Sequence, residues 1–105
     1  MIYDDIKGDY NWREAFTFAD FKPEDIEFIE AIDAGDNDGP AWVAMGRLKD
    51  GRWWFLTAWC DYTGWGCQDG GHSTCVATRE DLVRTVLGAE DRLRLGCVIP
   101  GEGAP

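Results

Sequence analysis

The sequence predicts an α+β domain in which a small antiparallel sheet of three to four strands carries packed helices. Two apolar runs flank Asp50-Gly51 as in a β-hairpin, and amphipathic segments precede and follow this pair. The length of 105 residues, 45% of them hydrophobic, suits a single globular domain over residues 1–105. The chain has no apolar run of the roughly 20 residues that a membrane span needs.

The N-terminal region is expected to contribute one short helix. Residues 1–10 are polar and acidic, which predicts a loosely attached lead-in, and the absence of an apolar signal-peptide core favours a cytoplasmic protein. We expect Asn11 to cap a helix over residues 12–19, because apolar residues recur at helical spacing and share one face. These residues are Trp12, Ala15, Phe16 and Ala19.

Residues 23–33 fit two interpretations. As a helix, the segment would place Pro23 in the first turn and Gly35 at its end. As a strand, it would alternate between the two faces of a sheet, and its β-branched and aromatic residues favour this alternative. The Gly-, Asn-, Asp- and Pro-rich segment at residues 35–40 predicts a loop.

The hairpin at residues 41–59 is the clearest predicted element. Asp50-Gly51 suits a two-residue type I′ turn, which would set Trp42 opposite Trp59 and Met45 opposite Leu56. Both faces of this hairpin are largely apolar, so we expect helices or a partner to cover both.

The second half of the chain is predicted to turn from loop to helix. Residues 61–74 are rich in Gly and polar groups, which indicates an ordered loop, and a short strand follows at residues 73–77. Thr78 is the expected N-cap of a helix over residues 79–87. A last helical turn is expected at residues 90–95, and residues 98–105 are expected to form a frayed tail.

Acidic residues are concentrated at the start of the chain. Residues 1–40 contain twelve acidic and three basic side chains, for a charge of −9, whereas residues 41–105 carry −1. Such a field repels nucleic acid and anionic membranes and attracts basic proteins. The alternative is a solvated face that only keeps the protein dissolved. If the cluster binds a partner, its contact residues are Asp20, Glu24, Asp25, Glu27, Glu30, Asp33, Asp36 and Asp38, with exposed Tyr62 and Trp65 as aromatic anchors.

Three cysteines and the sole histidine fall within sixteen residues. Cys60, Cys67, His72 and Cys75 form a Cys₃His set of the kind that holds structural zinc, which makes a zinc-stabilised module the second hypothesis. No Cys-x-x-Cys spacing is present, so free thiols packed as small hydrophobes are the simpler interpretation, with no cofactor. A Cys60–Cys67 disulfide is a further alternative.

No arrangement of residues predicts an enzyme. His72 is the one imidazole available to activate a nucleophile, and its nearby cysteines lie on the same Gly-rich segment. The glycine pairs of this segment lack the Lys-Ser/Thr sequence of a phosphate-binding loop. We therefore expect a binding protein.

The residues around Cys60 carry a resemblance to known proteins. Asp50-Gly51-Arg52, the aromatic strand at residues 53–59 and the Cys-Asp-Tyr-Thr-Gly-Trp-Gly-Cys-Gln run at residues 60–68 resemble a group of small bacterial and bacteriophage proteins. The resemblance spans about residues 24–95, and it implies a shared fold and a phage setting rather than a mechanism. A phage setting implies an inhibitor that mimics DNA, such as an anti-CRISPR protein, which occupies the basic channel of a CRISPR effector or nuclease in the host cytoplasm. There carboxylates would replace phosphates in Arg forks.

Overall fold

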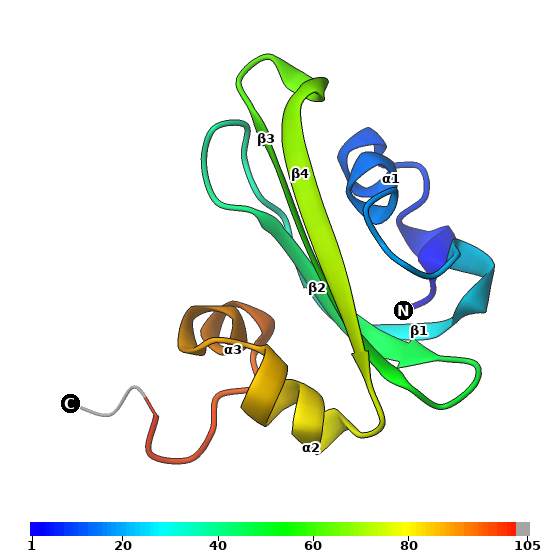
Figure 1. Ribbon diagram of the computed structural model, residues 1–105, viewed down its shortest axis with the longest axis vertical. Helices are drawn as coiled ribbons and strands as arrows, with labels where there is room; N and C mark the ends of the chain where they lie inside the picture. Colours follow the sequence, from blue (N-terminus) through cyan, green and yellow to red (C-terminus); the bar gives the residue numbers. More distant parts are fainter. Residues whose placement is uncertain (103–105) are drawn as a thin grey trace.

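The sheet is a four-stranded meander with helices on both of its faces. The computed structural model describes residues 1–102. Its strands lie in the order β1-β2-β3-β4, and each pairs antiparallel with its neighbours. Figure 1 shows α1 on one side of this sheet and α2 and α3 on the other. The predicted α+β class and the four-stranded antiparallel sheet are confirmed. The strand bounds are Ile26–Asp33 for β1, Trp42–Leu48 for β2, Trp53–Asp61 for β3 and Gly64–Val76 for β4.

Helix α1 spans Tyr10–Phe16, so it begins and ends earlier than the sequence predicts. Asp9, rather than Asn11, is the N-cap, because its side chain accepts the backbone N–H groups of Asn11 and Trp12 at 2.9 and 3.2 Å. The predicted apolar face is confirmed, since Trp12, Ala15 and Phe16 are buried.

The first residues are attached to the sheet instead of forming a loose lead-in. Met1 exchanges two main-chain hydrogen bonds with Ile29 of β1, at 3.0 and 2.6 Å. Tyr3 begins the short 3₁₀ turn Tyr3–Asp5, and its ring packs edge-on against Phe16 with centroids 5.2 Å apart. Tertiary contacts therefore order a segment whose composition alone suggests mobility.

Residues 26–33 form strand β1, which resolves the earlier alternative in favour of a strand. Its pairing with β2 shifts register at two places, and Ile26 and Ile29 are buried. The strand lies at one edge of the sheet and carries acidic side chains between its buried positions.

The predicted hairpin register is wrong by one residue. The backbone N–H of Leu48 donates to Arg52 O at 2.8 Å, which closes a three-residue loop over residues 49–51 with Gly51 at φ +95°. Trp42 consequently pairs with Ala58 and Met45 with Phe55. A one-residue shift moves every side chain of a strand to the opposite face, so the side chains of β3 exchange faces relative to the prediction.

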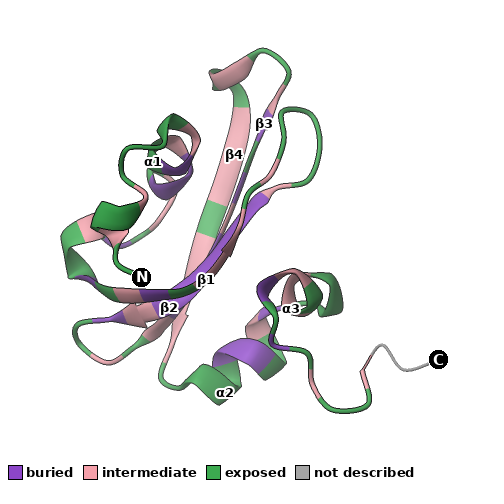
Figure 2. Ribbon diagram, turned by 180° about the vertical axis from the view of Figure 1, so that it is seen from behind, coloured by how far each residue is buried: buried purple, intermediate pink, exposed green. Residues whose placement is uncertain are grey.

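Each face of the sheet has its own hydrophobic core, as the two apolar faces of the hairpin predicted. Figure 2 shows buried stretches in the central strands and in the helices on either side of the sheet. The α1 face is filled by large rings, with Trp54 fully buried between Phe16 and Phe21. Gly46 lies under that ring, because a Cβ there would come within 2.8 Å of Trp54 Cζ2. The opposite face is built from smaller residues, which are Val43, Met45, Phe55, Leu82, Val83, Leu87, Leu95 and Cys97.

The predicted loop at residues 61–74 is a strand for most of its length. β4 has 13 residues, and its positions 69–76 pair with residues 53–60 of β3 without a register shift. The glycine and polar content indicated a loop, but β3 supplies main-chain partners that override local propensity. Only Tyr62 and Thr63 remain between the two strands.

The C-terminal helices follow a capped turn. Thr78 accepts the backbone N–H of Asp81 at 3.1 Å, as predicted, and α2 spans Arg79–Asp81. A π-helical turn, Leu82–Val86, continues α2, and α3 spans Ala89–Leu95 before Gly96 at φ +74°. No helix within residues 1–102 has the length and apolar character to cross a membrane.

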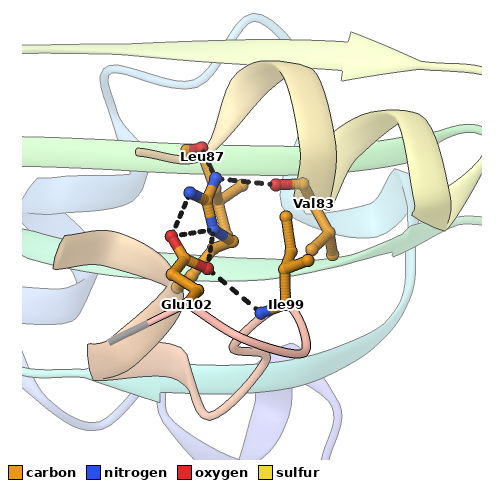
Figure 3. A network of polar contacts seen from close by, with 5 residues as sticks. Val83, Leu87, Ile99 and Glu102 are labelled. Carbon is orange, nitrogen blue, oxygen red and sulfur yellow. Dashed lines mark hydrogen bonds and ion pairs between the residues drawn. The ribbon is translucent and has the colours of Figure 1, made fainter. Parts of the chain in front are cut away.

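The segment after α3 is held by one arginine up to the last described residue. The Arg92 guanidinium pairs with the Glu102 carboxylate and also donates to the carbonyl oxygens of Val83 and Leu87 (Figure 3). The backbone N–H of Ile99 donates to the same carboxylate at 3.1 Å. Residues 98–102 are therefore anchored instead of frayed, and the rest of the predicted tail, residues 103–105, lies outside the described part.

Candidate interaction surface

Three of the predicted contact carboxylates are bound by the protein's own arginines. Glu30 receives two hydrogen bonds of 2.7 Å from Arg79. Glu27 pairs with Arg47 at 2.9 Å, and Asp33 pairs with Arg94 at 2.7 Å. These carboxylates of β1 are compensated within the fold, so they have less charge to offer a partner than carboxylates without an arginine.

The arginines that bind β1 come mainly from the far end of the chain. Arg79 lies in α2 and Arg94 in α3, 49 and 61 residues after their partners. Arg94 is 16% exposed and also donates to Ala41 O at 2.8 Å, so it ties both ends of the loop between β1 and β2. Local sequence patterns contain no signal for such distant pairs.

The remaining predicted carboxylates form no ion pair within residues 1–102. Asp20, Glu24, Asp36 and Asp38 are exposed. Asp25 is also exposed, and it accepts the backbone N–H of Lys22 at 3.3 Å. These side chains keep their charge available to a partner.

The two predicted aromatic anchors differ. Tyr62 is 78% exposed at the turn between β3 and β4. Trp65 packs inward, with its ring 5.1 Å from that of Trp42 and its Nε1 donating to Asn11 Oδ1 at 3.0 Å. The expectation of an exposed Trp65 was therefore wrong.

A shallow hollow of about 450 Å³ lies where the β1–β2 loop meets the ends of β3 and β4. We call it the tip hollow. Three carboxylates and one indole ring dominate its lining, and the ring of Trp59 is 45% exposed. The lining residues are Asp38, Gly39, Trp59, Cys60, Asp61, Gln68 and Asp69.

The β1–β2 loop forms one wall of the tip hollow because it is fastened to β3. Asp38 adopts φ +57°, and its backbone N–H donates to Cys60 O at 2.8 Å. The Cys60 thiol donates to Asn37 Oδ1 at 3.1 Å. The loop composition predicted the turn, but this contact with a strand more than 20 residues away needed the tertiary structure.

The other wall comes from β3 and β4, and it contains residues that sequence reasoning missed. Gly70 leaves room for the Trp59 ring, since a Cβ there would come within 2.7 Å of Trp59 Cζ2. Asp61 accepts the backbone N–H of Thr63 at 2.9 Å, and Asp69 accepts that of Gly66 at 2.6 Å. These turns hold both carboxylates in place.

The tip hollow is suited to a cation. Its lining contains no basic residue. Burial raises the pKa of the Cys60 thiol, and the charges of Asp61 and Asp69 raise it further, so this thiol stays neutral. Carboxylates beside an exposed indole ring favour a guanidinium or ammonium group through charge-assisted hydrogen bonds and cation–π attraction.

The predicted zinc ligands are not brought together. Cys60 pairs with Asp69 and Cys75 pairs with Trp54, which separates the two thiols by about 20 Å along the strands. His72 pairs with Thr57 and lies on the opposite face from Cys75, while Cys67 is exposed. No group of three or more His, Cys, Asp or Glu side chains within residues 1–102 is arranged to hold a metal.

The four cysteines are free thiols, including Cys60 and Cys67, for which a disulfide was an alternative. Cys60 and Cys97 are buried in the two hydrophobic cores. Burial is the main cause of the raised pKa of Cys75 and Cys97. The positions of Cys60, Cys75 and Cys97 agree with their interpretation as packing groups, whereas Cys67 is exposed.

Comparison of the chain with family models, curated proteins and solved structures found no match. The function is therefore argued from the geometry of the tip hollow and the distribution of charge.

Proposed function

We propose that the protein is a small acidic inhibitor that binds a basic, nucleic-acid-binding surface of a partner protein. The tip hollow and the exposed carboxylates around it make the contact, and binding rather than catalysis is the function. The protein acts in the cytoplasm and requires no cofactor. The resemblance of residues 60–68 to phage proteins points to a CRISPR effector or nuclease of the host as the partner.

The observation that carries the proposal is the uneven pairing of charge. Seven of the ten basic residues form ion pairs, which leaves thirteen of the twenty acidic residues, all within residues 1–102, without one. The tip hollow holds three of these unpaired carboxylates beside the exposed Trp59 ring. A partner arginine placed there would gain hydrogen bonds that no internal group supplies.

The charge distribution also supports an indirect effect on nucleic acid. A net charge of −10 repels DNA and RNA but competes with them for a cationic channel. The partner complex should therefore weaken as salt rises and should be displaced by duplex DNA.

The test compares two sets of neutralised carboxylates on binding to purified host CRISPR effectors and nucleases. The triple variant Asp38→Asn, Asp61→Asn, Asp69→Asn should lose at least about tenfold in affinity, since charged interface contacts cost 2 kcal/mol or more when removed. The matched control Glu27→Gln, Glu30→Gln, Asp33→Asn should lose less than about threefold once folding is verified. Equal losses in the two variants, or binding that duplex DNA leaves intact, would contradict the proposal.

A further inference from the structure

We propose that the outer edge of β4, over residues 70–76, takes up an extended basic segment of the partner as a fifth strand of the sheet. The inference rests on the proposed function and specifies how the basic partner is held. Strand addition supplies affinity through main-chain hydrogen bonds, and alternate side chains of the added strand supply specificity.

The order of the sheet leaves β4 at an edge. Figure 1 shows β4 along the near side of the sheet, with no other element drawn across it. Within residues 1–102, β3 is the main-chain partner of β4 along this segment. Residues 18–20 approach it from the α1 face, where the Ser73 hydroxyl accepts Asp20 N–H at 2.8 Å and Phe18 lies against Gly71. Every second residue of an edge strand directs its N–H and C=O outward, so β4 offers unpaired main-chain groups.

The opposite edge is partly covered by the chain itself. Met1 pairs with Ile29 through two main-chain hydrogen bonds and occupies the outward main-chain groups at the middle of β1. The pairing of β1 also shifts register at two places, whereas residues 70–76 of β4 have neither feature within residues 1–102.

The open segment lacks the features with which proteins normally protect an edge strand. Such edges carry lysine, proline, inward-pointing charge or a bulge. Residues 70–76 read Gly-Gly-His-Ser-Thr-Cys-Val, with none of these residues, and they pair with β3 without a register shift.

Charge and continuity identify the occupant as a basic segment. A second copy of this chain would bring another charge of −10. Asp69 directly precedes the open segment and lines the tip hollow, and Asp20 adjoins Ser73. On the sheet, His72 shares a face with Trp59, their rings 6.5 Å apart, so an added strand continues the surface of the tip hollow.

The experiment uses a defined probe, a capped octapeptide of alternating arginine and threonine. Amide hydrogen exchange of the full chain is followed by NMR, with the peptide and with its fully N-methylated form as the matched control. We expect exchange at the outward amides of residues 70–76 to slow at least about tenfold with the first peptide. The peptide methylated at its backbone nitrogens keeps its charged side chains but lacks main-chain N–H donors, so it should bind at least about tenfold more weakly.

Two neighbouring proline variants locate the contact on the protein. Of Ser73→Pro and Thr74→Pro, one removes an N–H that bonds to β3 and destabilises the sheet, and the other removes an outward N–H and leaves the melting temperature unchanged. The variant that stays folded should lose the peptide, whereas Ser73→Ala, which removes only the contact with Asp20, should retain it.

The outcomes separate this inference from the proposed function. Binding confined to the tip hollow without protection along β4, absence of peptide binding, or a β4-mediated dimer in sedimentation would overturn strand addition. None of these results bears on the loss of effector binding by the tip-hollow variant. Protection along β4 together with unchanged effector binding by that variant would overturn the proposed function instead.

Discussion

Strand β1 and the tip hollow are both acidic, but the carboxylates of β1 are paired with arginines and those of the tip hollow are not paired within residues 1–102. On β1, Glu27, Glu30 and Asp33 are each held by an arginine. In the tip hollow, Asp38 has no such partner among residues 1–102, and within the same residues the carboxylates of Asp61 and Asp69 accept hydrogen bonds from their own turns alone.

A run of acidic residues in a sequence is therefore not a measure of the charge available on the surface. The arginines of α2 and α3 reach β1 because these helices pack on the face of the sheet opposite α1. They do not reach the tip hollow, so its carboxylates remain without an ion pair within residues 1–102. Carboxylates paired with an arginine stabilise the fold, and carboxylates without an ion pair are available for binding.

The largest expected effect tests whether Arg94 fastens the loop at the end of β1. Arg94→Ala leaves Asp33 and the Ala41 carbonyl without their partner and should lower the free energy of unfolding by about 2 kcal/mol. Urea denaturation measures the loss. Arg84→Ala is the control, because its pair with Glu80 is exposed and should contribute below about 0.5 kcal/mol. Equal losses would show that the half-buried arginine is no more important than a surface pair.

A smaller effect distinguishes the two classes of carboxylate directly. Glu30→Gln breaks the two-bond pair with Arg79 and should cost about 0.5–1 kcal/mol. Asp36→Asn removes an exposed carboxylate without an ion pair, so stability should stay constant or rise by a few tenths of a kcal/mol as repulsion falls. Thermal unfolding of both variants at low salt measures the difference. A larger loss of stability in Asp36→Asn than in Glu30→Gln would contradict the distinction between paired and unpaired carboxylates.

The smallest effect concerns the segment after α3, where an arginine is again used internally. Hydrogen bonds from Arg92 lower the pKa of Glu102, so this pair stabilises the fold above the ordinary glutamate pKa of about 4.3 and the stabilisation is lost as the pH falls. The protection factor of the Ile99 amide, which is its intrinsic exchange rate at each pH divided by the observed rate, should fall on acidification from pH 7 to pH 3, because its N–H donates to Glu102.

Glu102→Gln provides the control for this pH series. The protection factor at Ile99 in this variant should already be low at pH 7 and should show no additional acid-dependent step. A matching step in the variant would assign the transition to another carboxylate.

Local patterns were sufficient to predict the α+β class, the strand at residues 26–33 and the existence of the hairpin. The β-branched and aromatic content of residues 26–33, the apolar pattern of the hairpin and the Thr78 cap act over a few residues, so each is readable without knowledge of the rest of the chain. The two register shifts in β1, which bury Ile26 and Ile29, were not. The same local signals placed Trp12, Ala15 and Phe16 in the core.

The tertiary structure decided the register of β3, the strand at residues 64–76 and the direction of each tryptophan. Trp65 turned inward onto Trp42, while Trp59 stayed exposed over Gly70. Arginines 49 and 61 residues away determined which carboxylates remain uncompensated. The physical reason is that strand pairing and ion pairing depend on which distant groups packing brings together, and no local pattern encodes that proximity.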